Sequence, residues 1–177
     1  MSKVHIFGLD HFHQNLEAGC LTPAGIADER EQKVKLADTL REIVIKNGVG
    51  LIAEEGRLER PCLGYILAKE LKVGHIDITM PVEERKKQGI KTPEYDFQES
   101  TRKVAYAIFE QYMFDQVKAH DAWVTLIMCG HRHFRALKRL VEAAGDEVCP
   151  YDINDYGWYR GIPKEGAEGV IGYERES

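Results

Sequence analysis

Short apolar segments alternate with longer amphipathic ones along the chain, and this alternation limits the folds that it can adopt. The clearest apolar segment is 123–129, WVTLIMC, and Gly130 follows it. Such a run is typical of a strand that is buried on both faces of a sheet. Strands separated by helices need crossover connections, which give parallel pairing with helices on both faces of the sheet. The sequence therefore predicts an α/β fold.

The pattern predicts a mainly parallel sheet of five strands, which is too few for a closed barrel of eight. The first helix is expected to start at a capping box formed by Asp28 and Glu31 and to run to Lys46. A second helix should follow Pro61, a long one should end at His120, and a last one should end before Gly145, with a loop or short helix at 83–93. The predicted strands are 3–8, 49–54, 74–78, 123–129 and 147–151.

The size of the chain is typical of one domain. It has 177 residues and a mass of 20.2 kDa. Hydrophobic residues make up 44% of it and charged residues 30%, which is the composition of a folded protein rather than a disordered one. We expect one α/β domain over residues 1–151, with a loop-rich tail, 152–177, packed on it.

The charge balance and the short apolar runs argue against two classes of partner. The net charge of −5 predicts no basic surface for a nucleic-acid backbone. No apolar run approaches the roughly 20 residues that span a bilayer, and the first residues lack the core of a signal peptide. The four widely spaced cysteines are typical of free thiols in a reducing compartment. We therefore expect a soluble, cytoplasmic protein that binds neither nucleic acid nor membrane.

Titratable residues cluster where the predicted strands end. Because parallel strands place their carboxyl ends along one edge, where ligands bind, these side chains are expected to converge. Imidazole and carboxylate groups are ligands of zinc, manganese and cobalt, and they are also general acids and bases near neutral pH. In chain order, the candidates are Asp10, His11, His13, Glu54, Glu55, Asp77, His131, His133, Asp152 and Asp155.

Each candidate also has a structural interpretation. Glu54 and Glu55 could be partners of helix dipoles, and Asp77 could bind backbone N–H groups in a turn. His13 and His131 could be solvated loop residues. Cys129 is expected to be a buried thiol rather than a nucleophile.

Three short motifs resemble those of the TraB/Tiki group, within the erythromycin esterase/ChaN-like superfamily. They are Gly8-Leu9-Asp10-His11, Gly130-His131-Arg132-His133 and, between them, the strand Leu51-Ile52-Ala53-Glu54. The likeness spans residues 4–145. Less closely, it extends to Ile76-Asp77, to Glu84-Arg85 and to the long helix with Arg102 and Glu110. The resemblance implies an α/β fold and, for the Tiki branch, metal-dependent peptide hydrolysis. It makes His11, Glu54 and His133 the metal or catalytic residues, and Arg85 or Arg102 the group that stabilises negative charge.

The leading hypothesis is a small hydrolase of peptide or ester bonds that uses a divalent metal, Zn, Mn or Co. His11, His133 and Glu54 would hold the metal, with His13 and His131 as further candidates. Glu55, Asp10 or Asp77 would act as general base or would orient the histidines.

Two alternatives stay open. In the first, a metal-independent esterase or lyase, His11 or His133 is the general base and Glu54 orients it. In the second, a non-enzymatic domain binds a small anionic ligand at the helix after Gly130, with Arg132 and Arg135. The expected partner is a small-molecule or peptide substrate. A homodimer is left open, because aromatic residues of the tail could pack on the domain, line the cleft or form a dimer contact.

Overall fold

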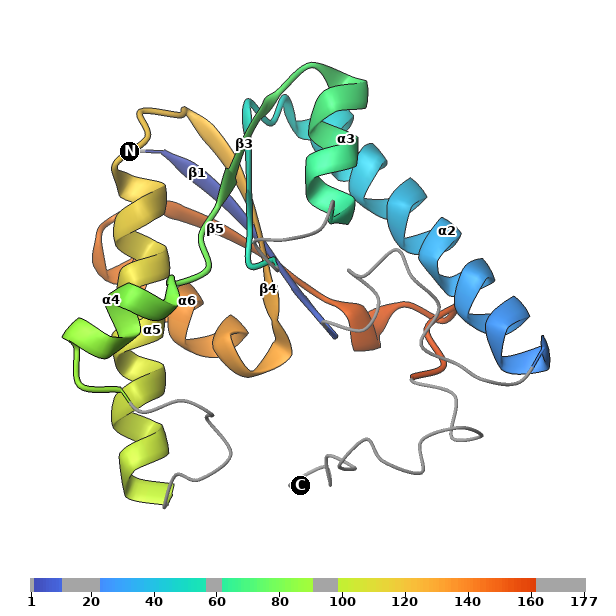
Figure 1. Cartoon of the computed structure of the whole chain (residues 1–177). Helices are drawn as coiled ribbons and strands as arrows, with labels where there is room; N and C mark the ends of the chain where they lie inside the picture. The colour runs from blue at the N-terminus through green and yellow to red at the C-terminus, as the bar shows by residue number, and fades with distance from the viewer. Residues whose placement is uncertain (1, 11–22, 57–61, 91–98, 162–177) are drawn as a thin grey trace.

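The computed structural model describes residues 2–10, 23–56, 62–90 and 99–161 (Figure 1). Its centre is a five-stranded sheet in which every pair is parallel, in the order β3-β2-β4-β1-β5. The predicted α/β fold with a parallel sheet is therefore confirmed. The strands are β1 (Lys3–Leu9), β2 (Leu51–Glu54), β3 (Gly74–Asp77), β4 (Val124–Gly130) and β5 (Glu147–Asp152).

Helices cover both faces of the sheet. Figure 1 shows α2 and α3 on one side and α5 and α6 on the other. Because side chains alternate between the faces of a strand, β2 directs Ile52 into the core under α2 and α3 and Ala53 into the core under α5 and α6. The helical segments are α2 (Pro23–Asn47), α3 (Leu63–Leu71), α4 (Val82–Lys87), α5 (Glu99–Lys118), α6 (His131–Ala143) and the 3-10 turn η2 (Ile153–Asp155).

The first helix begins earlier than the sequence pattern predicted. We expected its N-terminus at Asp28, but α2 starts at Pro23. Proline suits the first turn of a helix, because the N–H group that it lacks would have no partner there. Asp28 lies inside the helix, where its carboxylate accepts hydrogen bonds from Gln32 and Arg160. The predicted capping box is therefore wrong, and both of its acidic residues lie within the helix.

The neighbouring strands β1 and β4 send their helices to opposite faces of the sheet. Leu9, the last residue of β1, pairs with Gly130, the last residue of β4. The chain then leads from β1 to α2 on one face and from β4 to α6 on the other. In open α/β sheets the crevice at such a switch point is where ligands bind. The two strands that precede the histidine-bearing motifs therefore end side by side.

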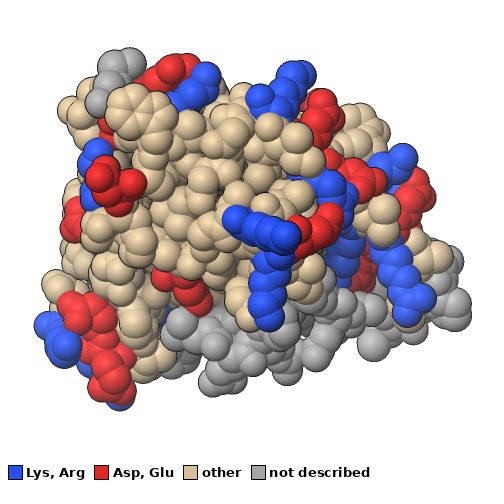
Figure 2. All heavy atoms as spheres, turned by 90° about the horizontal axis from the view of Figure 1, so that it is seen from above, with Lys and Arg blue, Asp and Glu red and all other residues tan. Residues whose placement is uncertain are grey.

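Neither the described helices nor the described charges on one face of the molecule indicate a membrane span or the binding of a nucleic-acid backbone. Within residues 2–10, 23–56, 62–90 and 99–161, no helix combines the length and the apolar character needed to cross a bilayer. Among the described residues in Figure 2, acidic and basic side chains lie interspersed around a centre with few charges. The described residues on this face therefore form no continuous basic patch of the kind that holds a phosphate backbone.

A buried histidine lies within β1. His5 is 1% exposed, and its Nδ1 atom lies 3.1 Å from the hydroxyl of Tyr151. Its Nε2 atom is buried without a hydrogen-bond partner. Burial lowers the pKa of His5 below its ordinary value, and the charge of Lys3 adds to the effect, whereas Glu147 opposes it. The folded protein therefore disfavours the charged imidazole.

This burial predicts a loss of stability in mild acid. The pKa of His5 is lower in the folded than in the unfolded chain, so below about pH 6.5 the unfolded chain binds a proton that the folded chain excludes. The free energy of unfolding should be fully retained above this pH and should fall as the pH falls toward the folded-state pKa. We expect urea denaturation at pH 7.5 and 5.5 to show a smaller pH effect in His5→Phe than in the wild type. Equal pH effects in the two proteins would contradict this prediction.

Candidate functional site

Two consecutive glutamates at the end of β2 point to opposite faces of the sheet. Glu54 lies on the side of α2 and α3, and Glu55 lies on the side of α5 and α6. This follows from the alternation of side chains along a strand, which Glu55 continues by donating its N–H to the carbonyl of Met128 at 2.8 Å. The two carboxylates therefore serve two different environments.

Glu54 binds the N-terminus of α3. The residue is fully buried, and its carboxylate accepts hydrogen bonds from the N–H groups of Gly64 at 3.1 Å and Tyr65 at 3.2 Å. His75 Nε2 lies 3.3 Å from the same carboxylate. A Cβ atom on Gly64 would lie 2.6 Å from Glu54 Oε2, so a glycine is needed for this close approach. Glu54 thus stabilises a helix dipole, and none of its described contacts is with His133.

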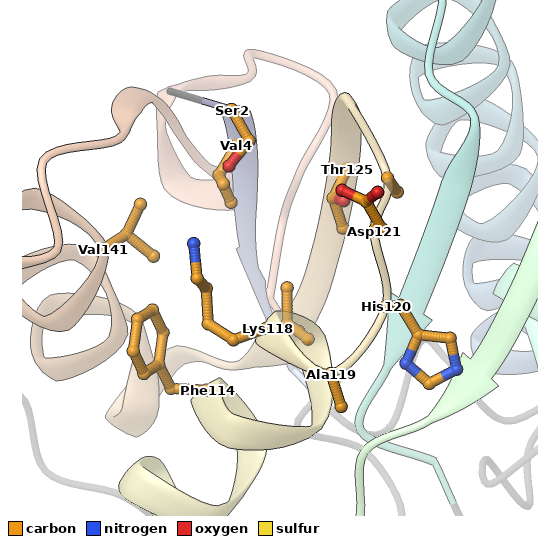
Figure 3. A pocket seen from close by; sticks show the side chains of 11 residues that line it. Ser2, Val4, Phe114, Lys118, Ala119, His120, Asp121, Thr125 and Val141 are labelled. Atoms are coloured by element: carbon orange, nitrogen blue, oxygen red, sulfur yellow. The ribbon is translucent and has the colours of Figure 1, made fainter.

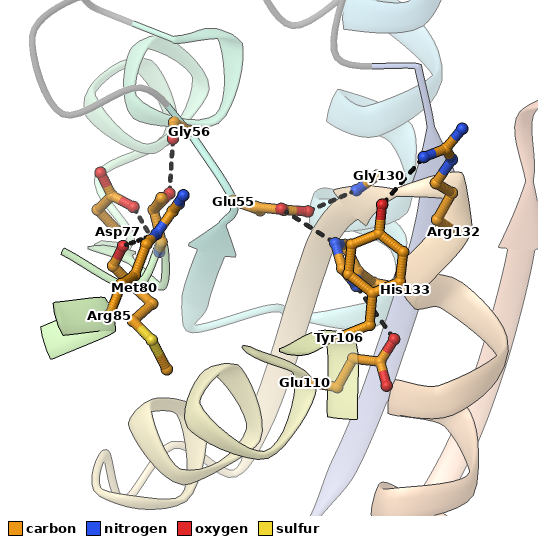
Figure 4. A network of polar contacts seen from close by, with 11 residues as sticks. Glu55, Gly56, Asp77, Met80, Arg85, Tyr106, Glu110, Gly130, Arg132 and His133 are labelled. Carbon is orange, nitrogen blue, oxygen red and sulfur yellow. Dashed lines mark hydrogen bonds and ion pairs between the residues drawn. The ribbon is translucent and has the colours of Figure 1, made fainter. Parts of the chain in front are cut away.

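Glu55 joins β2 to the start of α6. Its Oε2 atom accepts a hydrogen bond of 2.8 Å from the N–H of Gly130, the residue that precedes α6. Its Oε1 atom lies 3.4 Å from His133 Nε2 (Figure 4). One carboxylate therefore contacts both the helix N-terminus and a ring nitrogen of His133.

His133 is held between two carboxylates. While Nε2 faces Glu55, Nδ1 lies 3.1 Å from Glu110 Oε1 of α5. The ring of Tyr106 packs edge-on against the imidazole, with 5.3 Å between centroids. The side chain of His133 is 8% exposed and those of both glutamates are 12% exposed. We call Glu55, Tyr106, Glu110 and His133 the His133 cluster (Figure 4).

The first glycine motif has a packing role in placing α6. A Cβ atom on Gly8 would lie 2.9 Å from the ring of Phe134, which is the residue after His133. The absence of a side chain at Gly8 therefore lets the first turn of α6 approach β1 closely. This contact helps to hold His133 at the carboxyl edge of the sheet.

Two predicted acidic residues make local contacts outside the His133 cluster. Asp77 Oδ1 accepts a hydrogen bond of 2.8 Å from the N–H of Thr79, which is the turn contact expected of it as a structural residue. Asp10 accepts a hydrogen bond from the hydroxyl of Tyr159. Neither of these contacts brings the carboxylate to His133.

The other predicted site residues lie either outside the His133 cluster or in segments that the structure does not describe. His131 is exposed, and its Nδ1 atom lies 3.6 Å from Asp152 Oδ1. Arg85 donates from Nε to the carbonyl of Met80, and its guanidinium lies 4.9 Å from the ring centroid of Phe109. Arg102 is an exposed residue of α5. His11 and His13 lie outside the described residues.

Cys129 is a buried thiol, as the sequence predicted. It lies in β4 and is fully shielded from solvent. Burial raises its pKa well above the ordinary value, and the negative charges of Glu55 and Glu110 raise it further. The thiolate needed for nucleophilic attack is therefore disfavoured here.

The His133 cluster places two donors side by side for a metal ion. Among all the described residues, no group of three His, Cys, Asp or Glu side chains is arranged to hold such an ion. His133 Nε2 and Glu55 Oε1, 3.4 Å apart, are donors that Zn, Mn and Co accept. Glu110 is engaged by the other ring nitrogen. The described donors therefore do not make a complete metal site, and the predicted ligands His11 and His13 lie outside the described part of the chain.

A cavity lies at the other edge of the sheet. It has a volume of about 310 Å³ and lies between the end of α5 and the starts of β1 and β4 (Figure 3). Lys118, which lines it, is paired with Asp146 at 2.9 Å. Its charge is therefore already neutralised within the protein. The convergent titratable groups lie at the carboxyl edge instead, and we place the candidate site there.

Glu110 and Tyr106 were not among the predicted site residues. The sequence places Glu110 next to Phe109 on the apolar stripe of a long helix, and the family resemblance mentions it only as a less close feature. The sequence signal that could have identified Glu110 is a carboxylate at the border of the buried face of a helix, where charged residues are uncommon without a partner. Its partner lies 23 residues away in the sequence, at a distance that helical spacing does not predict.

Comparison with protein-family models, with curated proteins and with solved structures finds no match to this chain. The resemblance to the TraB/Tiki group therefore stays a prediction from three short motifs. The geometry of the His133 cluster carries the functional argument.

The structural role of Glu54 can be tested by Glu54→Gln. The amide keeps the shape but removes the charge that two backbone N–H groups and the dipole of α3 stabilise. We expect the free energy of unfolding to fall by about 1–3 kcal/mol in chemical denaturation.

Glu83→Gln is the matched control, because Glu83 is an exposed residue whose carboxylate pairs with the exposed Lys86 at 2.9 Å. Its effect should not exceed about 0.5 kcal/mol. A Glu54→Gln protein as stable as the control would show that the contact with α3 contributes nothing.

Proposed function

We propose that the protein is a small hydrolase in which His133 moves the protons and Glu55 stabilises the imidazolium, and that it acts on an ester or peptide bond of a small-molecule or peptide substrate. The observation that carries this proposal is the placement of His133 between Glu55 and Glu110, next to the switch point of a parallel sheet. An imidazole oriented by one carboxylate and facing a second polar group is a common arrangement for general acid–base catalysis.

Glu110 orients the imidazole. When Nδ1–H donates to Glu110, the lone pair of the imidazole is on Nε2, the nitrogen that faces Glu55. The edge-on ring of Tyr106 packs against the imidazole and limits its rotation. The cluster thus fixes the orientation of Nε2, the nitrogen that exchanges protons.

The proposed reaction begins when Nε2 takes a proton from a water molecule. The water oxygen bonds to the carbonyl carbon of the substrate, and the imidazolium that forms is stabilised by the carboxylate of Glu55. As the carbon–oxygen or carbon–nitrogen bond breaks, Nε2 returns its proton to the leaving group. Proton transfer of this kind contributes about 10²- to 10⁴-fold to the rate.

Arg85 is our choice for the group that stabilises negative charge on the carbonyl oxygen. The family resemblance names Arg85 or Arg102 for this role. Figure 4 shows Arg85 on the side of β3 and α4, with Glu55 between it and His133 in this view. The cation–π contact with Phe109 and the bond to the carbonyl of Met80 hold the arginine in this place.

A metal-assisted form of the same hydrolase is the second candidate. Two observations favour it: Nε2 of His133 and Oε1 of Glu55 lie 3.4 Å apart, and a carboxylate faces the other ring nitrogen, as is usual around metal-bound histidine. His133 and Glu55 would be two of the ligands, and His11 would be the predicted third. A divalent ion bound there would lower the pKa of its water toward about 7.

A non-enzymatic anion-binding domain is less well supported. That alternative relied on the N-terminus of α6, where backbone N–H groups attract negative charge. The N–H of Gly130 already donates to Glu55. The carboxylate of Glu55 would repel a second anion at this position.

Substitutions in the His133 cluster test the proposed hydrolase directly. We expect untagged protein to hydrolyse members of a panel of p-nitrophenyl esters and fluorogenic peptides. His133→Gln and Glu55→Gln should each lower kcat/KM by about 100-fold or more, because each removes a group that moves or stabilises the proton. Thermal melting of each variant checks that it is folded.

His120→Gln is the matched control for these variants. His120 is exposed at the opposite edge of the sheet, where its Nδ1 atom lies 2.9 Å from the carbonyl of Gln116. Its activity should equal that of the wild type. A wild type that hydrolyses no member of the panel, or a His133→Gln variant with full activity, would refute the proposal.

Metal removal separates the two forms of the hydrolase. If the reaction needs no metal, activity should survive dialysis against EDTA. If it needs a metal, activity should be lost on dialysis and should return with Zn, Mn or Co. Elemental analysis of the untagged protein should then find stoichiometric metal in the wild type and less in Glu55→Gln.

A further inference from the structure

The described chain ends in a segment that crosses from the sheet to α2. Figure 1 shows it running from η2, beyond the end of β5, toward the N-terminal half of that helix. We call residues 156–161 the strap. The ring of Tyr156 stacks on Phe7 of β1 with 5.7 Å between centroids, and Trp158 packs on Tyr156 at 5.6 Å. The aromatic part of the strap therefore rests on the core under α2 and α3.

A buried glutamine on α2 binds the backbone at the end of the strap. Gln32 is fully buried, and its Oε1 atom accepts a hydrogen bond of 2.9 Å from the N–H of Arg160. Its Nε2 atom lies 3.3 Å from the carbonyl of Gly161 and 2.7 Å from Asp28 Oδ2. The amide thus bonds to the strap as a neighbouring strand would. Because a buried amide without partners is costly, Gln32 favours the docked strap.

Charged contacts outside this amide add to the docking. The guanidinium of Arg160 donates to Asp28 at 2.6 Å and to Glu31 at 3.0 Å. All three side chains are partly or fully exposed, so these ion pairs are weakened by salt. Gln32 itself is fully buried and uncharged, so its bonds to the strap backbone should depend less on salt.

The strap also reaches the carboxyl edge of β1. The hydroxyl of Tyr159 donates a hydrogen bond to Asp10, the residue after the last residue of β1. Leu9 pairs with Gly130, which is bonded to Glu55 of the His133 cluster. Tyr159 of the strap is thus bonded at the end of β1, and β1 lies beside β4, the strand that leads into the His133 cluster.

We propose that the strap is a positioning element of the functional edge, in which Gln32 holds the strap on α2 and Tyr159 holds Asp10 at the end of β1. Asp10 lies beyond the paired part of β1, so the bond from Tyr159 restricts a segment that the ladder does not. Tyr159 is therefore a positioning residue rather than a catalytic one. The link to catalysis rests on the proposed hydrolase, whereas the docking of the strap does not.

Trp158 provides a direct readout of docking. The only other tryptophan, Trp123, is 78% exposed at the opposite edge of the sheet, so Trp123→Phe leaves a single reporter on the strap. In this background Gln32→Leu should shift the Trp158 emission to longer wavelength, and Arg160→Ala should do so to a smaller extent. Tyr159→Phe should leave the emission unchanged, because its ring still packs. An unshifted spectrum in both Gln32→Leu and Arg160→Ala would overturn the docking role of these residues.

Hydrogen exchange tests the positioning of Asp10. In Tyr159→Phe, which deletes only the hydroxyl, exchange in the peptide that contains Leu9 and Asp10 should accelerate by about tenfold, as it should in Gln32→Leu. A peptide from β3 serves as the control and should be unchanged in both variants. If Leu9 and Asp10 exchange at the same rate in Tyr159→Phe as in the wild type, the positioning role of Tyr159 is overturned.

Activity measurements connect the strap to the proposed function. Tyr159→Phe should lower kcat more than it changes KM, by about tenfold, because a displaced Asp10 disturbs the end of β1, which pairs with Gly130 beside the His133 cluster. If the wild type shows no hydrolysis, the proposed function is refuted. The fluorescence and exchange results would still test the docking of the strap and the positioning of Asp10. If Tyr159→Phe accelerates exchange but keeps full kcat, the positioning role in catalysis is refuted.

Discussion

The geometry of a β-strand, which turns consecutive side chains to opposite faces, separates the two glutamates at the end of β2. A carboxylate buried at the end of a strand must be paired or hydrogen-bonded. Glu54 meets this need at the N-terminus of α3, and Glu55 meets it at the residue before α6 and at His133. The same two residues therefore tie both helical layers to β2. One of them is structural and the other is available for chemistry.

The position of His133 depends on this division. Gly130 ends β4 beside Leu9 and directly precedes α6, so the third residue of the helix, His133, falls next to the carboxylate of Glu55. The close approach of Phe134 to Gly8 fixes the same turn from the side of β1. Glu110 then reaches Nδ1 from α5. An imidazole between two carboxylates is thus the result of strand register, a missing Cβ atom and the packing of two helices.

Features that depend on local sequence were predictable. The apolar run in β4 and the alternation of strands with helices predicted the parallel sheet, and its edge correctly located the histidine of the second glycine motif. The predicted start of the first helix was wrong, because Asp28 and Glu31 resemble a capping box although they lie within α2, where they bind Arg160. Local propensity cannot distinguish a capping residue from an acidic residue with a partner 129 residues or more away.

The contacts that define the site are long-range, and for that reason the sequence predicted them only in part, with Glu55 as one of three residues that could orient the histidines. The choice between Glu54 and Glu55 depends on which face of β2 carries α6, and this requires the strand order. Glu110 reaches the edge from a helix that the family resemblance covers only loosely, and Tyr159 reaches it from the tail, where no motif marks it. Their roles emerge only when the sheet, α5 and the strap are placed together.

The most direct test of this account is the protonation pattern of the His133 ring. Proton–nitrogen correlation spectra of protein labelled with ¹⁵N-histidine would show it, with His133→Gln used to assign the signals. The account predicts that Nδ1 carries a proton and that both nitrogen resonances change in Glu110→Gln and in Glu55→Gln. A proton on Nε2 alone, with a spectrum that neither substitution alters, would contradict it.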